Sequence, residues 1–119
     1  MKFIFIICAT FLSLFLCSDA MAEVKCVGMY ERHSNDDPLY EEVELEVTYE
    51  QFGQRRVEGQ IFDYYYSVFF DENFSTYRSG IYFGPGYTSG TISTGSFKEG
   101  EALKLAVVKQ QEVFTILCN

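Results

Sequence analysis

Residues 42–50 read Glu42-Val43-Glu44-Leu45-Glu46-Val47-Thr48-Tyr49-Glu50, in which acidic or polar side chains alternate with apolar ones. Successive side chains of an extended strand point to opposite faces, so this pattern predicts one β-strand with one face on a core and the other in water. The wet face carries a row of carboxylates from Glu42, Glu44 and Glu46. This row is a candidate docking face for a cationic partner, or else a solvated face that discourages pairing with other chains.

Further runs of strand character follow on both sides of this stretch, and turn signals such as Gly84-Pro85-Gly86 separate them. Many short strands separated by frequent turn signals are typical of an antiparallel β-sandwich or a small β-barrel. Residues 101–109 include good helix formers, but the alternation of Leu103, Leu105 and Val107 favours a strand. We therefore expect an all-β domain of seven or eight strands. The expected strands cover residues 24–30, 42–50, 55–62, 64–70, 74–83, 87–94, 102–109 and 112–118.

The first 22 residues have the organisation of a secretory signal peptide. Lys2 precedes an apolar run over residues 3–17, and Ala20-Met21-Ala22 places small side chains before the expected cleavage point. The apolar run is shorter than the roughly 20 residues that a transmembrane helix needs. We expect residues 23–119 to form a single domain that a bacterial Sec-type pathway exports to the periplasm or the medium, without a membrane span.

Cleavage would leave two of the four cysteines, Cys26 and Cys118, near opposite ends of the mature chain. Such a pair in an oxidising compartment predicts a disulfide. The bond would join the first strand to the last and, in the chain-entropy model, contribute about 4–5 kcal/mol.

The chain has 9 basic and 17 acidic residues, a formal net charge of −8. Removal of the leader takes one lysine and one aspartate and leaves this charge unchanged. Nucleic-acid-binding proteins need a basic surface, so we expect no nucleic-acid partner.

Residues equipped for catalysis are few. His33 is the one histidine of the sequence, and it lies with Asp36 and Asp37 in a polar segment that is typical of a solvated loop. We therefore predict no bound metal, no cofactor and no catalytic role. The alternative is a hydrolase with paired carboxylates, for which Asp63, Asp71 and Glu72 beside the aromatic strand are the candidates.

The segment Tyr64-Tyr65-Tyr66-Ser67-Val68-Phe69-Phe70 places rings on both faces of one strand. A sheet face in water needs no rings, so Tyr64, Tyr65 and Phe69 form a candidate binding surface, together with the glutamate row. The leading hypothesis is a binding protein whose partner is a protein or a glycan of the cell envelope or extracellular space. In one alternative a second sheet covers the rings, and in another they line the cavity of a lipocalin-like carrier.

Four fragments of the sequence resemble the periplasmic inhibitors of c-type lysozyme: Val24-Lys25-Cys26, Ser79-Gly80-Ile81-Tyr82, residues 97–103 and Cys118. The spacing from the Ser-Gly pair to the tyrosine is one residue shorter than in that family, and the chain has no tryptophan. The resemblance implies a small β-barrel in which Ser79 and Gly80 lie on a loop that enters the lysozyme cleft.

Overall fold

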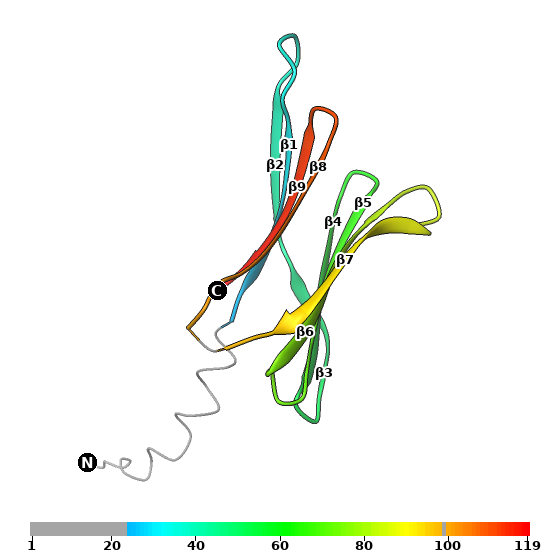
Figure 1. Cartoon of the computed structure of the whole chain (residues 1–119). Coiled ribbons are helices and arrows are strands. Elements are labelled where there is room, and N and C mark those ends of the chain that lie inside the picture. Colours follow the sequence, from blue (N-terminus) through cyan, green and yellow to red (C-terminus); the bar gives the residue numbers. More distant parts are fainter. Residues whose placement is uncertain (1–23, 99) are drawn as a thin grey trace, which may run out of the picture.

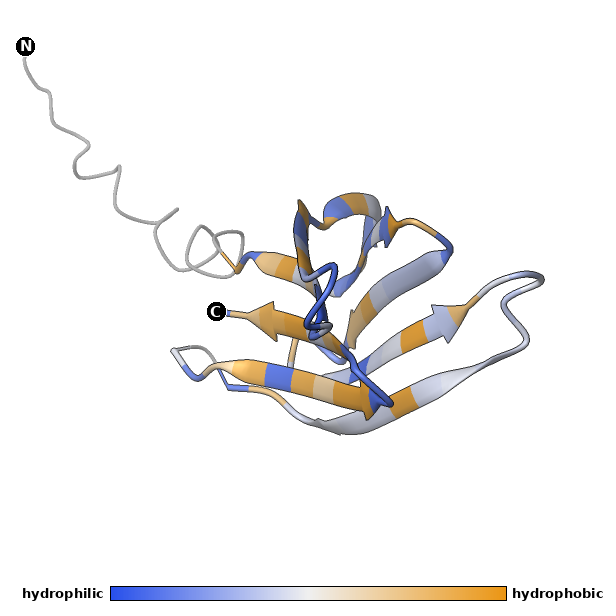
Figure 2. Cartoon of the chain, turned by 90° about the horizontal axis from the view of Figure 1, so that it is seen from above, coloured by the Kyte–Doolittle hydropathy of each residue, from blue (hydrophilic) through white to orange (hydrophobic). Residues whose placement is uncertain are grey.

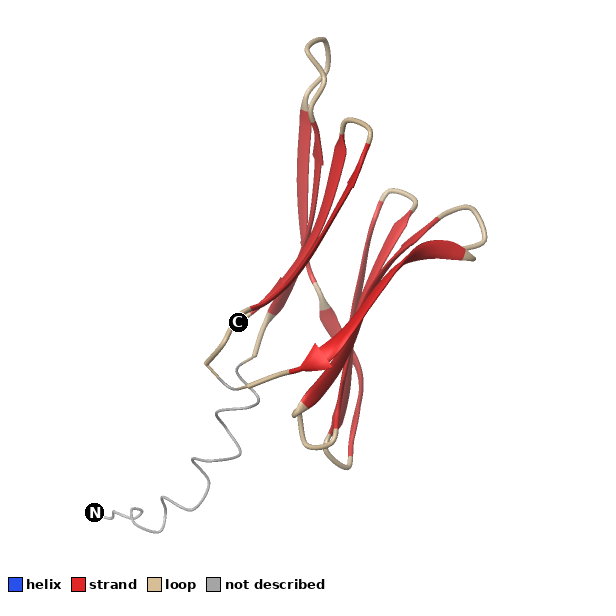
Figure 3. Cartoon of the chain, viewed as in Figure 1, coloured by secondary structure: helices blue, strands red, loops and turns tan. Residues whose placement is uncertain are grey.

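The computed structural model describes residues 24–98 and 100–119, so the expected signal peptide lies outside the described residues. Within them the chain forms nine β-strands and no helix (Figure 3). The strands are β1 (Cys26–Arg32), β2 (Leu39–Glu44), β3 (Glu46–Gln51), β4 (Gln54–Ile61), β5 (Tyr64–Asp71), β6 (Thr76–Phe83), β7 (Ser89–Ser96), β8 (Leu103–Lys109) and β9 (Glu112–Cys118).

The strands form two antiparallel sheets that face each other and diverge towards one end (Figure 1). The four-stranded sheet has the order β2-β1-β9-β8, and the five-stranded sheet has the order β3-β4-β5-β6-β7. This arrangement confirms the all-β prediction and selects the sandwich over the closed barrel. Residues 103–109, which also had helical character, form strand β8.

The stretch 42–50 is not one strand, and this prediction was wrong. The chain leaves β2 at Glu44, turns at Leu45 and enters β3 in the other sheet at Glu46. The Leu45 side chain is buried at this corner, and its backbone N–H donates to the carbonyl oxygen of Cys26 at 2.9 Å. A chain that contributes strands to two packed sheets has to bend between them. A buried leucine at the bend packs in the core that the two sheets share.

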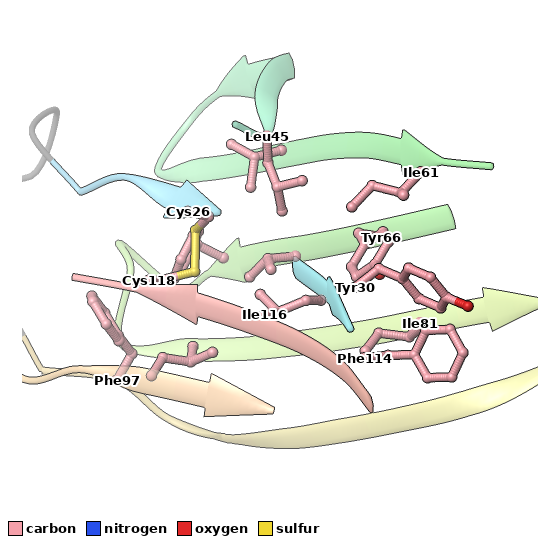
Figure 4. Close-up of a cluster of buried hydrophobic side chains, with 14 residues drawn as sticks. Cys26, Tyr30, Leu45, Ile61, Tyr66, Ile81, Phe97, Phe114, Ile116 and Cys118 are labelled. Carbon is pink, nitrogen blue, oxygen red and sulfur yellow. A yellow bond between two sulfur atoms is a disulfide. The ribbon is translucent and has the colours of Figure 1, made fainter. Parts of the chain in front are cut away.

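Between the sheets lies a core that combines tyrosine and phenylalanine rings with aliphatic side chains (Figure 4). Tyr66, Phe70 and Phe114 are at most 1 % exposed. The Tyr66 hydroxyl donates to the carbonyl oxygen of Met29 at 3.0 Å, so its polar atom keeps a hydrogen bond inside the core. Burial of each such side chain contributes about 1.5–3 kcal/mol, and in a chain without tryptophan these rings supply the bulk that joins the sheets.

Cys26 and Cys118 form the predicted disulfide. The two residues are direct cross-strand partners in β1 and β9, and both are buried. The bond closes a sequence separation of 92 residues and joins the two central strands of the four-stranded sheet.

Candidate functional site

The outer face of the five-stranded sheet, which points away from the other sheet, carries a hollow of about 320 Å³. Side chains from β4, β5 and β6 and from the turn before β7 form its floor and walls. We call this hollow the aromatic groove. Its lining residues are Arg56, Glu58, Tyr65, Ser67, Phe69, Arg78, Tyr82 and Tyr87.

The register of the strands explains why the sheet is hollowed here. Ser67 lies in a row with Gly80 on β6 and Glu58 on β4. The rows on either side hold large side chains, with Phe69 beside Arg78 in one and Tyr65 beside Tyr82 in the other. The small side chain of Ser67 between these larger ones leaves a depression at the middle strand.

Gly80 is required by the position of Tyr82. A Cβ atom at residue 80 would lie 2.6 Å from the Tyr82 hydroxyl oxygen and 2.8 Å from its Cζ atom, so the ring of Tyr82 lies directly over Gly80. A glycine inside a strand often marks such a close approach.

One wall of the groove is a set of three tyrosines. The ring centroid of Tyr65 lies 6.0 Å from that of Tyr82 and 6.0 Å from that of Tyr87. Tyr87 comes from the turn between β6 and β7, and its hydroxyl accepts a hydrogen bond from the Gln60 side-chain amide at 3.1 Å. Three rings from different elements thus present faces, edges and hydroxyl groups to one hollow.

The opposite wall consists of one phenylalanine between two arginines. Phe69 of β5 pairs with Arg56 of β4 on one side and with Arg78 of β6 on the other. The Arg56 guanidinium carbon lies 5.3 Å from the centroid of the Phe69 ring, which places the cation on the ring face. Among the described residues neither arginine forms an ion pair. Both guanidinium groups therefore retain donors for an outside partner.

Burial and a hydrogen bond to Glu58 raise the pKa of Tyr65 to about 12. The Tyr65 hydroxyl therefore stays protonated at neutral pH, and the carboxylate of Glu58 is its acceptor. Glu58 is the one carboxylate among the described residues that line the groove.

The predicted binding surface divides between the two faces of the sheet. Tyr65 and Phe69 lie in the groove. Tyr64 points between the sheets, where its ring centroid is 4.6 Å from that of Phe114 and its hydroxyl donates to Glu112 at 3.1 Å. Tyr64 therefore does not belong to this surface, because adjacent residues of a strand face opposite sides.

The glutamate row is also divided. Glu42 and Glu44 lie on the outer face of the four-stranded sheet, where they pair with Met29 and Val27. Glu46 lies on the outer face of the five-stranded sheet, opposite Glu58. All three of these side chains are exposed, but the bend at Leu45 separates them into two groups.

The loop expected at Ser79 and Gly80 is absent, since both residues lie inside strand β6. Ser79 points into the core with no exposed surface, and its hydroxyl oxygen is the one buried side-chain polar atom without a partner among the described residues. Ser79 cannot enter the cleft of another protein from this position.

The residues considered for a metal site or a hydrolase site form hydrogen bonds or ion pairs within the protein. His33 bonds to Glu31 at 2.9 Å, and Asp37 forms an ion pair with Arg32 at 2.6 Å. Asp71 accepts from the Gln54 side chain and from the backbone N–H of Glu72, which together lower the pKa of the Asp71 carboxyl. Over residues 24–98 and 100–119, no cluster of histidine, cysteine and acidic residues is arranged to hold a metal ion.

The sequence did not reveal Arg56, Arg78, Tyr82 and Tyr87 as site residues. Strand pairing places Arg56, Arg78 and Tyr82 around Tyr65 and Phe69, the turn before β7 brings Tyr87 to Tyr65, and no local motif marks these four residues. Comparison with known proteins finds no matching family model, no matching curated protein and no matching solved structure. The described part of the chain contains no helix with the length and hydropathy that a membrane crossing requires.

Proposed function

We propose that this chain is an exported binding domain that holds an acidic carbohydrate, a glycan bearing carboxylate groups, in the aromatic groove. The observation that carries the proposal is a pair of arginines, on either side of Phe69, that have no ion-pair partner among the described residues and lie next to a wall of three tyrosines. The proposal keeps the expected class of function and narrows the partner to one chemistry.

The rings supply a surface for sugar. Tyr65, Tyr82 and Tyr87 combine flat apolar faces with hydroxyl groups, and tyrosine is favoured where one end of a side chain meets apolar atoms and the other meets water. A pyranose ring has the matching character, with C–H groups on its faces and hydroxyl groups at its edge. Rings on a sheet face that no other element covers gain most from such a partner.

The arginines favour an anion over a neutral sugar. A guanidinium group presents donors in a planar fork that matches a carboxylate, and charge-assisted bonds of this kind are about twice as strong as neutral ones. Arg56 and Arg78 are two strands apart, a distance of about 10 Å, so they can hold two groups on neighbouring sugar units. The protein as a whole is acidic, so the two arginines form a small positive area on a negatively charged molecule. They therefore favour an anion only when it is close enough to contact them.

The dimensions of the hollow favour a short stretch of glycan. Its volume of about 320 Å³ is at the lower end of the range for small-molecule sites. The space between the sheets, where a lipocalin-like carrier would hold an apolar ligand, contains the rings of Tyr66, Phe70 and Phe114. The inhibitor hypothesis loses its loop, because Ser79 is buried.

Binding fits the chemistry of the groove better than catalysis. A glycoside hydrolase of the usual type needs two carboxyl groups about 5–10 Å apart. Among the described groove residues only Glu58 carries a carboxylate, and it accepts a hydrogen bond from Tyr65. The disulfide between Cys26 and Cys118 supports export to an oxidising compartment, the periplasm or the medium.

Isothermal titration with a galacturonic acid trimer tests this proposal, with a neutral galactose trimer as the matched ligand. We expect the acidic trimer to bind and the neutral trimer to bind at least tenfold more weakly. Arg56→Gln and Arg78→Gln should each reduce the affinity for the acidic trimer about tenfold or more, because each removes a charge-assisted contact.

Lys25→Gln is the control, since it removes one exposed positive charge next to β1 in the other sheet. Equal binding of both trimers, or an equal loss in Lys25→Gln and the arginine variants, would contradict the proposal. Binding that persists in both arginine variants would place the ligand elsewhere.

A further inference from the structure

The outer face of the four-stranded sheet is largely apolar on its two central strands. Outward-facing positions of a sandwich are usually polar, yet four of the six that β1 and β9 present here are apolar: Val27, Met29, Val113 and Leu117. The other two are Thr115, which is buried, and Glu31, whose carboxylate bonds to His33. Strand β9 has hydrophobic residues on both of its faces, and most of its ribbon has the hydrophobic colour in Figure 2. The four side chains are half-buried, and the neighbouring Val108 of β8 is 70 % exposed. We call these five residues the apolar face.

Opposite charges lie at the two edges of the apolar face. Glu42 and Glu44 project from β2 at one edge, and Lys104 projects from β8 at the other. The register places Glu44 and Lys104 at the two ends of one row, with Val27 and Leu117 between them.

We propose that the apolar face binds a second copy of this chain about a two-fold axis that runs parallel to the strands. Rotation about this axis turns the β2 edge of one copy onto the β8 edge of the other. Because the axis preserves the level of each row, Glu44 of one copy then meets Lys104 of the other, and the same pair forms twice. Such a contact is self-complementary, as a two-fold interface requires.

The charges also exclude the other simple arrangement. A two-fold axis perpendicular to the strands would place β2 of one copy on β2 of the other. The acidic edge formed by Glu42 and Glu44 would then face the acidic edge of the partner. Like charges across an interface are unfavourable and suppress that orientation. An anionic membrane surface is a poor occupant for the same reason, since the acidic edge would repel it.

The size of the patch predicts a weak dimer. Strands lie about 4.8 Å apart and same-face residues about 6.8 Å apart, so three rows across four strands cover roughly 400 Å² on each copy. Two copies would bury roughly 800 Å², below the range of stable complexes and typical of transient ones. We expect dissociation constants between about 1 μM and 1 mM.

Sedimentation velocity across protein concentrations up to about 1 mM tests the proposal. The exported chain should change from monomer to dimer within this range. Glu44→Lys should make it a monomer, and so should Lys104→Glu. The double variant with both changes should dimerise again, because it restores each pair with the charges exchanged.

Glu46→Lys is the matched control, because it makes the same charge reversal two residues away on the other sheet. It should leave the dimer unchanged. A chain that stays monomeric at about 1 mM would overturn the proposal. A dimer that Glu44→Lys does not affect, or that the double variant does not restore, would overturn it too.

Discussion

Gly80 and Tyr82 show how a single residue shapes the candidate site. The ring of Tyr82 can lie over the strand only because residue 80 has no side chain. Had residue 80 been alanine, the Tyr82 hydroxyl would have to move to make room. This dependence does not follow from the sequence pattern, which predicted a strand over residues 74–83 but not which ring lies over Gly80.

Gly80→Ala should therefore weaken the binding of an acidic trimer while the fold is retained. The clash involves the far end of a side chain, so Tyr82 can swing away at little cost to stability. Tyr82→Ala should also weaken binding, and the double variant should bind no more weakly than Tyr82→Ala alone, since the alanine at residue 80 then displaces nothing. Titration calorimetry of the three variants gives this cycle, and additive losses would show that Gly80 does not act through Tyr82.

Because of Tyr30 and Tyr65, the free energy of unfolding should depend on pH in the alkaline range. Burial, with a hydrogen bond to Glu112, raises the pKa of Tyr30 to about 12, and Tyr65 has a similar value. An unfolded chain ionises its tyrosines near pH 10. The stabilisation is therefore fully present below about pH 10 and lost as the pH rises towards 12.

Urea unfolding between pH 8 and pH 12 measures this loss. The free energy of unfolding should be flat at the lower end and fall above about pH 10, and Tyr65→Phe should fall less steeply than the native chain. A curve with the same slope in Tyr65→Phe would mean that Tyr65 has an ordinary pKa in the folded state.

The turn between β2 and β3 shows what a strand pattern can and cannot predict. The alternation of residues 42–50 correctly placed Val43 and Leu45 towards the core and Val47 opposite the buried Val57, but a register shift after Val47 turns Tyr49 outward, where it lies opposite Arg56. The alternation could not predict the bend, because a buried leucine at a corner has the same neighbours in sequence as a buried leucine inside a strand. The separation of Glu46 from Glu42 and Glu44 follows from that corner and was missed for the same reason.

Leu45→Ala should destabilise the protein by about 2–5 kcal/mol, the usual cost of removing a fully packed leucine. Val47→Ala is the matched control: it lies two residues away in the same alternation but is 52 % exposed, so its loss should be small. Denaturant unfolding of both variants decides whether the corner is part of the core. Equal losses would indicate one regular strand with no special position at Leu45.

At the level of the whole molecule, the sequence was most informative about features that depend on composition and order. Strand character, an antiparallel sandwich or barrel and the pairing of Cys26 with Cys118 were predicted, and the structure selects the sandwich. The aromatic groove was only half predicted, because Tyr65 and Phe69 come from one conspicuous segment whereas Arg56, Arg78 and Tyr82 reach them only through strand pairing. The register between strands exists only in the folded chain, and no local sequence pattern around these three residues predicts it.

Replacement of both Cys26 and Cys118 by alanine should lower the free energy of unfolding by about 4 kcal/mol. The disulfide closes a loop of 92 residues, so it removes much of the entropy of the unfolded chain. Thermal or denaturant unfolding with and without a reductant gives the same comparison in the native chain. A change below about 1 kcal/mol would mean that the unfolded state is already compact without the bond.

We propose that the outer face of the five-stranded sheet binds an acidic glycan. Heteronuclear NMR of the labelled protein during titration with a galacturonic acid trimer tests this binding site most directly. We expect saturable shifts of backbone amides around the groove, at Arg56, Ser67, Phe69, Gly80 and Tyr82, with β1 and β9 unchanged. Shifts confined to the other sheet, or none at millimolar trimer, would contradict it.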